Sequence, residues 1–213
     1  MLKRAMDLSH PLAPGMSLYP GSRPLQITPT HTMESDGSRV SELTLNTHLG
    51  THLDAPRHML PQGESLSDLP LTHFFGPGLV VDCSSCKSTI FLEHFQNREE
   101  QIRAVDFLLL HTGYSRFWGR DEYLGNFPVL SPKAAEWLTG CHLKGLGVDA
   151  ISVDPLDSTA HPVHKILLEH QLVIIENLGD LSSLVNQSFF FQCLPLPIPG
   201  LDGSPTRALA FLD

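Results

Sequence analysis

Three histidines and one aspartate are concentrated in the short segment HLGTHLDAPRH, residues 48–58. In an extended or bulged chain, His48, His52 and Asp54 share one side because their separations are even. A helix would align His48 with His52 but turn Asp54 away, and Gly50 disfavours a helix here. Two imidazoles and a carboxylate on one side are ligands for a first-row divalent cation and leave coordination positions open for water. The spacing therefore predicts a metal site.

A single histidine is more commonly an ordinary surface or core residue, which is the competing interpretation for each of these side chains. For this segment that expectation is reversed, because His48, His52, Asp54 and His58 are all potential metal ligands and lie an even number of residues apart. The histidines outside the two clusters have no such potential ligands spaced around them and are expected to be surface or core residues without a metal. Among them, His111 stands out because it lies at the end of an apolar strand. They are His10, His31, His73, His94, His111, His142 and His170.

A second cluster lies in the segment HPVHKILLEHQLVIIE, where His161 and His164 are three residues apart on one face of a predicted helix. Glu176 ends the apolar strand that follows, and a carboxylate in that position needs a partner. An ion pair with Lys or Arg and ligation of a metal are both open. Spacing alone does not join this cluster to the first one.

Short apolar or alternating segments bounded by turn residues predict a β-rich α/β fold that positions these side chains. The segment 40–48 alternates so that His48 would arrive on the polar face of a strand. The predicted strands are 5–9, 40–48, 78–82, 106–111, 145–153, 172–176, 188–194 and 207–212. Helices are predicted over 132–139, with Ser131 as N-cap and Pro132 in the first position, over 162–170, and over 91–101, where the pattern is weaker.

The composition indicates one globular domain, expected over 1–213, because 41% of the 213 residues are hydrophobic and can bury a sizeable core. Fourteen Lys and Arg against 23 Asp and Glu give a net charge of −9. Such a surface repels phosphate backbones and anionic lipid, which argues against nucleic acid and membranes as partners. The basic start MLKR reaches no apolar stretch long enough for a signal peptide, so we expect a cytoplasmic protein.

The four cysteines are expected to be free thiols, since a chain without an export signal belongs in a reducing compartment. Cys83 and Cys86 form a lone CxxC with no second pair to complete a zinc knuckle. Inert thiols are therefore favoured over a structural metal or a redox role.

With these residues identified, the chain resembles the metal-dependent cyclase/hydrolase family that includes the bacterial-type kynurenine formamidases. The family signature HxGTHxDxPxH stands in full in residues 48–58. The segments SVDPLD, DGSPTRA and LLLHTGYSRFW, the interval from His164 to Glu176, and the early Tyr-Pro-Gly also resemble family segments. The resemblance runs nearly end to end and implies an α/β fold of the swivelling β/β/α type.

The resemblance also implies two divalent metal ions, expected to be zinc, with manganese as the alternative. The implied ligands are His48, His52 and Asp54 for one ion, with Asp54 bridging to a second ion that His164 and Glu176 complete. His58 is then the acid/base. His161 has no clear counterpart and is expected to lie behind the ligands or at the surface.

The implied activity is cleavage of N-formyl-L-kynurenine to kynurenine and formate, a step of tryptophan catabolism. Metal hydroxide would attack the formyl carbonyl while His58 takes the proton and delivers it to the departing nitrogen. The partner is then a small aromatic amide, and the family implies a homodimer or a higher homo-oligomer. Tyr19 replaces the tryptophan typical of kynurenine formamidases and is expected to contact the aromatic ring of the substrate, with Tyr114, Phe117 and Trp118 as further candidates.

Two alternatives remain open. An isatin hydrolase-like enzyme acting on a cyclic amide would use the same metals and base, and only its pocket would differ. A non-catalytic metal-binding protein is the other alternative, although a purely structural site would close its coordination and has no need of a nearby acid/base such as His58.

Overall fold

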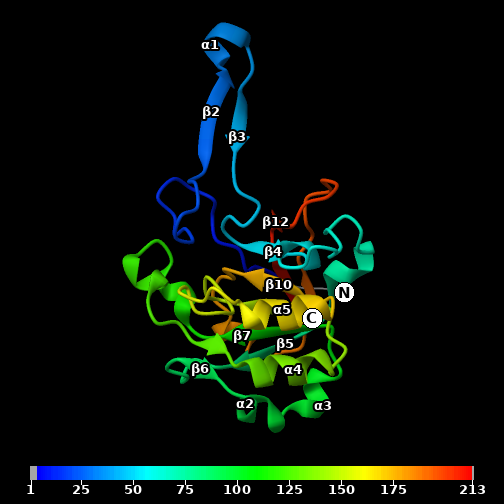
Figure 1. Cartoon of the computed structure of the whole chain (residues 1–213). Coiled ribbons are helices and arrows are strands. Elements are labelled where there is room, and N and C mark those ends of the chain that lie inside the picture. Colours follow the sequence, from blue (N-terminus) through cyan, green and yellow to red (C-terminus); the bar gives the residue numbers. More distant parts are fainter. Residues whose placement is uncertain (1–3, 213) are drawn as a thin grey trace.

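A curved sheet of nine strands forms the centre of the molecule (Figure 1). The structure is a computed structural model, and it describes residues 4–212. The strand order is β1-β13-β11-β5-β7-β9-β10-β4-β12. The strands are β1 (Arg4–Asp7), β4 (His52–Asp54), β5 (Phe75–Asp82), β7 (Phe107–His111), β9 (Gly145–Val148), β10 (Val173–Glu176), β11 (Phe189–Gln192), β12 (Gly203–Pro205) and β13 (Leu209–Leu212).

The four central strands, β5, β7, β9 and β10, run parallel to one another. Their sequences are apolar almost throughout, as is typical of strands covered on both faces. In β7, Leu108 and Leu110 enter the core on one face of the sheet, whereas Phe107 and Leu109 enter the core on the other. The sheet therefore lies between two apolar layers, and polar side chains are confined to the ends of these strands.

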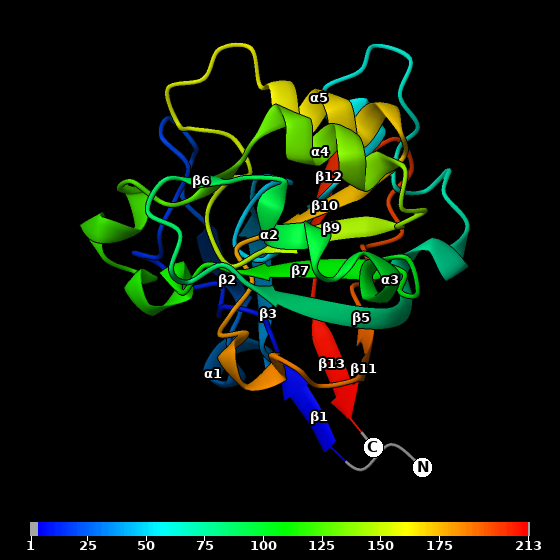
Figure 2. The same cartoon turned by 90° about the horizontal axis from the view of Figure 1, so that it is seen from below.

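Two helices pack together on one face of the sheet (Figure 2). Helix α4 (Pro132–Thr139) begins as the sequence predicts, because the Ser131 side chain accepts a hydrogen bond from the Ala134 amide and Pro132 occupies the first position. Helix α5 (Pro162–Glu169) contacts β10 and buries His164 together with its apolar residues. Among the described residues, no helix has the length and apolar character needed to cross a membrane.

The remaining elements are short and lie outside the main sheet. They are α1 (Met33–Asp36), α2 (Glu93–Gln96), α3 (Glu99–Ile102), the paired strands β2 (Gln26–His31) and β3 (Val40–Thr44), the paired strands β6 (Thr89–Ile90) and β8 (Val129–Leu130), and 3-10 helices at Pro56–His58, Leu71–Phe74, Tyr114–Phe117, Asp121–Leu124 and Ser182–Leu184.

The predicted α/β class is confirmed, and every predicted strand has a counterpart, but three elements depart strongly from their predicted bounds. The strand expected over 145–153 ends at Val148, and the helix expected over 91–101 is broken into α2 and α3 because the intervening Arg98 leaves the helical conformation. The strand expected over 40–48 ends at Thr44. Residues 45–51 form a loop instead, with Gly50 at a positive φ of 64°. His48 therefore does not lie on a strand continuous with β4, and the argument that even spacing places it on the same side as His52 and Asp54 was wrong.

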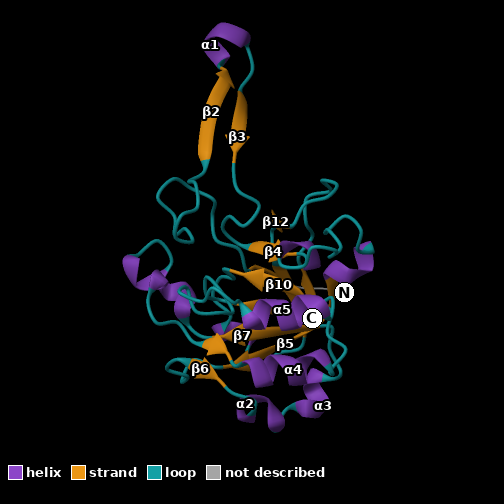
Figure 3. Cartoon of the chain, viewed as in Figure 1, coloured by secondary structure: helices purple, strands orange, loops and turns teal. Residues whose placement is uncertain are grey.

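Strands β2 and β3 form a hairpin that projects from the rest of the molecule, with α1 at its tip (Figures 1 and 3). We call residues 26–44 the arm. Every residue of the arm is exposed, so it contributes nothing to either core. The sequence did predict a strand for part of this segment, but it did not indicate that the strand leaves the sheet.

Candidate active site

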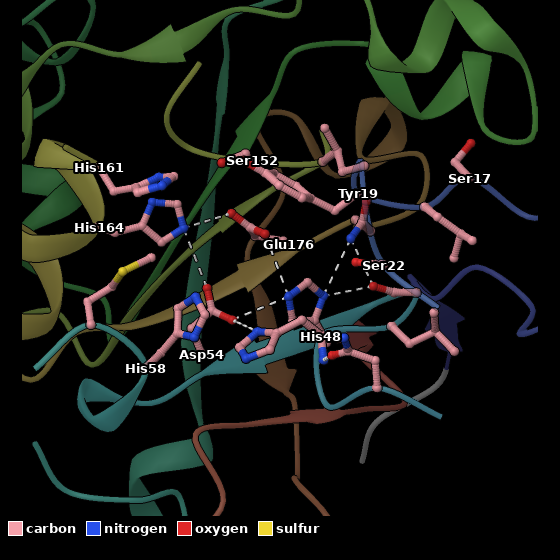
Figure 4. Close-up of a pocket in the computed structure, with 18 residues that line it drawn as sticks. Ser17, Tyr19, Ser22, His48, Asp54, His58, Ser152, His161, His164 and Glu176 are labelled. Atoms are coloured by element: carbon pink, nitrogen blue, oxygen red, sulfur yellow. Dashed lines mark hydrogen bonds and ion pairs between the residues drawn. The ribbon is translucent and has the colours of Figure 1, made fainter. Parts of the chain in front are cut away.

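Strands β4 and β10 bring three of the predicted site residues together (Figure 4). His52 and Asp54 are two residues apart on β4 and point to the same side. The antiparallel pairing places Glu176 opposite His52 and Ile174 opposite Asp54. Helix α5 packs on β10 and adds His164 to the same cluster. Backbone pairing thus joins two clusters that are far apart in the sequence.

His48 reaches the cluster from the loop before β4 rather than from a strand. Its ring approaches the backbone of β12 so closely that a Cβ built on Gly203 would lie 2.6 Å from His48 Cε1. Glycine is therefore required at this position of β12. The positive φ of Gly50 turns the loop so that His48 and His52 lie with their ring centroids 5.1 Å apart.

The two oxygens of Asp54 face different imidazoles. Oδ1 lies 2.6 Å from His48 Nδ1 and 3.3 Å from His52 Nε2, whereas Oδ2 lies 3.7 Å from His164 Nε2. Glu176 is arranged in the same way, with Oε2 3.6 Å from His52 Nε2 and Oε1 3.3 Å from His164 Nε2. Both carboxylates therefore lie between His52 on one side and His164 on the other.

The residues present fit a divalent metal. Atoms bound at about 2.1 Å to one tetrahedral ion lie ~3.4 Å from each other, and the separations within this cluster are close to that value. His52, Asp54 and Glu176 each offer one atom within 4.8 Å of the others. His52 Nε2 and Asp54 Oδ2 are buried and have no hydrogen-bond partner, which is costly unless something binds them.

The grouping of these side chains differs from the expectation. Ligand atoms of His48 and Asp54 gather with one of His58, His52 gathers with Asp54 and Glu176, and His164 gathers with His161 and Asp154. Asp54 belongs to two of these three groups.

Hydrogen bonds behind two of the imidazoles fix which ring nitrogen faces the site. His52 Nδ1 donates to the Gly50 carbonyl at 2.8 Å. His164 Nδ1 donates to Asp154 Oδ2 at 2.7 Å. In both rings Nε2 is left to face the carboxylates, which is the arrangement that presents a lone pair to a metal.

The carboxylates of the site stabilise the protonated, positively charged form of a neighbouring imidazole. Burial disfavours protonated His48, but Asp54 and Asp202 outweigh that effect and raise its pKa to about 9. Burial also opposes charge on Asp54, yet His48 and His52 hold the pKa of that carboxyl well below its usual range. Protonated imidazole therefore balances the buried carboxylate in the metal-free protein, and a metal must compete with protons for the same ligands.

His58 occupies the end of the 3-10 helix Pro56–His58 and packs against His48, with ring centroids 4.0 Å apart and ring planes tilted by 39°. Its Nδ1 lies 3.5 Å from Asp202 Oδ2, which also accepts a hydrogen bond from His48 Nε2 at 3.0 Å. Burial lowers the pKa of His58, and together with charge on His48 and His164 it outweighs the opposing effect of the Asp54 carboxylate. A neutral, partly exposed imidazole at this position can accept a proton.

These residues line one cavity of about 290 Å³. Its size is near the lower end of the range of about 300–1,000 Å³ typical of small-molecule pockets. Tyr19 forms part of the wall opposite the cluster, together with Ser17 and Ser22 from the same loop (Figure 4). The Tyr19 hydroxyl donates to the Leu156 carbonyl at 3.4 Å, so its polar end is held and its ring borders the cavity.

All seven predicted site residues line this cavity, namely Tyr19, His48, His52, Asp54, His58, His164 and Glu176. His161 lines it as well, at the residue before α5, with a positive φ of 45° and a buried Nδ1 that has no hydrogen-bond partner. The aromatic candidates Tyr114, Phe117 and Trp118 are not among the lining residues; Trp118 stacks on His10 instead.

Three supporting residues were missed by sequence reasoning. Asp154 and Asp202 lie inside the segments SVDPLD and DGSPTRA, so their segments were noticed but their contacts to the site histidines were not. Asn177 follows Glu176 directly, and its side chain donates to the same Gly50 carbonyl that holds His52. An Asn after an apolar strand gives no signal of this role in a single sequence.

Sequence comparison identifies relatives along nearly the whole chain. The family described as "Putative cyclase" matches residues 6–155. A kynurenine formamidase from Salinibacter ruber is 34% identical over 206 residues, which cover 96% of this chain and 95% of that protein. A kynurenine formamidase from Bacillus mycoides is 33% identical over 205 residues, with the same shares covered.

Solved structures share the fold. An isatin hydrolase bound to the product analogue thioisatinate superposes with a TM-score of 0.86 at 22% identity, covering 98% of this chain and 92% of that one. A potential metal-dependent hydrolase with cyclase activity superposes with a TM-score of 0.83 at 27% identity, covering 99% and 98%. Together with the His, Asp and Glu cluster, these relatives support a metal-dependent hydrolase, and the chain belongs to the cyclase family.

Proposed function

We propose that the protein is an arylformamidase that cleaves N-formyl-L-kynurenine to kynurenine and formate. The observation that carries the proposal is a single cavity with a metal-ligand cluster on one wall and the aromatic ring of Tyr19 on another. An N-formyl arylamine has the two matching parts, a carbonyl for the cluster and an aryl ring for Tyr19. The kynurenine formamidases among the relatives support the same substrate.

In this proposal two divalent ions, zinc first and manganese as the alternative, bind the ligands expected from the family resemblance. His48, His52 and Asp54 hold one ion, while His164 and Glu176 hold the other with Asp54 between them. The two Asp54 oxygens face different imidazoles, Oδ1 toward His48 and His52 and Oδ2 toward His164. This arrangement supports the bridging role. When bound, such ions supply a water molecule of lowered pKa and polarise a carbonyl oxygen.

His58 acts as the acid/base in the same proposal. Its Nδ1 faces Asp202, so Nε2 is the atom that accepts a proton from the attacking water and returns it to the departing aryl nitrogen. The C–N bond of the formamide breaks, water supplies the new C–O bond, and the arylamine leaves neutral. The lowered pKa of His58 keeps the ring neutral and ready to accept that proton.

Tyr19 positions the aryl ring. The hydrogen bond from its hydroxyl to Leu156 fixes the side chain, so the ring offers a prepared face at little further entropic cost. Ser17, Ser22 and Asn46 also line the cavity and provide hydrogen-bonding groups for the polar end of the substrate.

A cyclic amide of the isatin type is the second candidate, and one observation favours it. Among the residues that line the cavity there is no Lys or Arg to pair with the carboxylate of an amino-acid substrate, and a neutral cyclic amide needs no such partner. In that case the same ligands and the same His58 act on a ring amide.

The deciding experiment compares kcat/KM for N-formyl-L-kynurenine and isatin with the metal-loaded protein. We expect the formamide to be the better substrate, and chelation followed by metal addition to abolish and restore turnover. A preference for isatin of more than about tenfold would exclude the formamidase assignment and leave the hydrolase assignment intact. Turnover of both compounds that survives metal removal would contradict the metal-dependent mechanism itself.

A further inference from the structure

Cys86 and His94 form a side-chain pair outside the candidate active site. Cys86 Sγ lies 3.1 Å from His94 Nε2, although eight positions separate the two residues in the sequence. Cys86 belongs to the loop that follows β5, and His94 belongs to α2, at the end of the molecule opposite the arm (Figure 1). Strands β7 and β9 separate β5 from β10, which carries Glu176. The pair is therefore distinct from the metal-ligand cluster.

The ring of His94 is held so that one of its nitrogens faces the thiol. His94 Nδ1 lies 3.0 Å from the carbonyl oxygen and 3.1 Å from the amide nitrogen of Phe91. In the tautomer with the proton on Nδ1, that proton is donated to the Phe91 carbonyl and the lone pair of Nε2 accepts the Cys86 S–H. If the thiol proton moves to Nε2, the bond to Phe91 is kept. Proton transfer thus needs no rearrangement of the ring.

Cys86 is the most accessible of the four cysteines. Cys83, Cys141 and Cys193 are buried, whereas Cys86 is only partly buried and His94 is exposed. Burial raises the pKa of the Cys86 thiol, although the contact with Cys83 opposes this effect. The free thiol is therefore the resting form. Since the thiolate is the nucleophile, reaction at Cys86 depends on a base that removes its proton, and His94 is placed to be that base.

Cys83 lies next to this pair. The Cys86 amide donates to the Cys83 carbonyl at 2.9 Å and closes a turn over residues 84 and 85. The ends of such a turn lie within about 7 Å of each other at Cα, which is comparable with the separation of about 4.4–6.8 Å found across disulfides. Cys83 is 0% exposed, so a reagent from solution meets Cys86 first.

We propose that Cys86, His94 and Cys83 form a thiol site that is oxidised by peroxides. His94 Nε2 takes the thiol proton, and Cys86 Sγ attacks one peroxide oxygen. The O–O bond breaks, Cys86 becomes a sulfenic acid, and the departing oxygen takes the proton from His94 and leaves as water or an alcohol. Cys83 Sγ then attacks Cys86 Sγ, the S–O bond breaks, and the hydroxyl leaves as water with the Cys83 proton. One peroxide is reduced while two thiols become a disulfide.

A structural metal is the competing occupant of the same three side chains. Ligand atoms around one tetrahedral ion lie ~3.4 Å from each other. Within residues 4–212, the groups whose ligand atoms gather within 4.8 Å of one another do not include Cys83, Cys86 and His94 together. The geometry therefore favours oxidation of the two thiols over metal binding.

The first test measures the rate at which iodoacetamide modifies the thiols of the full chain. We expect peptide mapping to find Cys86 modified before the three buried cysteines. His94→Gln should slow the modification of Cys86 by about tenfold or more near neutral pH, since a general base typically contributes ~10²–10⁴-fold. His170→Gln is the matched control, because His170 is also exposed and its Nδ1 also bonds a backbone carbonyl, that of Ile166 at 2.9 Å. Equal rates for wild type and His94→Gln would overturn the role of His94.

The second test uses hydrogen peroxide as the oxidant. The treated chain should lose two hydrogen atoms, and peptide mapping should join Cys83 to Cys86 until dithiothreitol reopens the bond. Cys83→Ala should stop at a sulfenic acid on Cys86 that dimedone traps, whereas Cys141→Ala, which alters another buried cysteine, should close the disulfide as wild type does. Wild-type residues 83 and 86 that stay unlinked, or thiols that resist peroxide because they hold zinc, would overturn the proposal. Neither test involves turnover, so both are independent of the proposed function.

Discussion

Asp154 offers a sharp test of the metal centre because it hydrogen-bonds to the proposed ligand His164 and is not itself one of the proposed ligands. Its Oδ2 accepts hydrogen bonds from His164 Nδ1 at 2.7 Å and from the His164 amide at 3.0 Å, while Oδ1 accepts from the Val163 amide at 3.1 Å. Burial disfavours its charge, but the bonds from His164 hold the pKa of this carboxyl below its usual range. The change Asp154→Asn keeps the size of the side chain and removes one acceptor oxygen.

The expected effect follows from the tautomer of His164. If the amide nitrogen of the substituted side chain faces the ring, Nδ1 becomes an acceptor and the proton moves to Nε2, the nitrogen that must bind metal. If the amide oxygen faces the ring instead, the Val163 amide at the start of α5 loses its acceptor. Loss of such a supporting group typically lowers metal affinity ~10–100-fold, which corresponds to about 1.4–2.7 kcal/mol.

The assay is competition for zinc between the metal-free protein and a chelating dye, with circular dichroism to verify the fold. Asp157→Asn is the matched control, because it makes the same change at an exposed position three residues further on. An Asp154→Asn protein that remains folded and binds zinc within twofold of wild type would refute the placement of His164 in the metal centre. Equal losses for both variants would indicate a general charge effect.

Three further predictions concern catalysis, substrate and pH. His58→Ala should retain metal and fold while kcat falls by ~10²–10⁴-fold, as measured by turnover alongside metal analysis; loss of metal in proportion to activity would make His58 a ligand. Tyr19→Trp should preserve or improve kcat/KM on N-formyl-L-kynurenine, and Tyr19→Ala should act mainly by raising KM; unchanged values for Tyr19→Ala would remove the ring from the binding site. The Asp149 carboxylate, 3.3 Å from His111 Nδ1, raises the pKa of His111, so protonated His111 stabilises the fold at acid pH and this contribution disappears as pH rises through its folded pKa. Thermal melting should therefore show a stability difference between wild type and His111→Gln that is largest below the ordinary histidine pKa of about 6.5 and narrows as pH rises above it, and a difference that widens would contradict the pairing.

The sequence predicted the central sheet well for a physical reason. β7 and β10 are continuous apolar runs ending in a polar residue, His111 and Glu176, and such runs are typical of parallel strands buried on both faces. The limits of β3 were not predictable in the same way. The alternation of residues 40–48 is real, but it belongs to a hairpin outside the core, and local pattern carries no information about what a strand packs against.

The site was also predictable from the sequence in one part and not in another. The composition of residues 48–58 was enough to locate the candidate metal centre, although the geometric reason given for it was wrong, because a turn at Gly50 and not a common strand brings His48 to Asp54. Asp202 could not be placed from the sequence alone. It is separated from His48 by 154 positions and meets it through the pairing of β12 with β4, a long-range contact that only the fold determines.

The pairing of β4 with β10 has a consequence for how this kind of enzyme can diversify. His52, Asp54 and Glu176 are held by a backbone register, so a one-residue insertion in either strand would turn ligands to the wrong face of the sheet. Tyr19, Ser17 and Ser22 belong to a loop outside the sheet and are free of that constraint. Substitutions and length changes in the loop can alter which carbonyl compound fits while the metal ligands stay in place. Selection for a new substrate in this scaffold is therefore expected to accumulate changes around residues 17–22 and to spare β4 and β10.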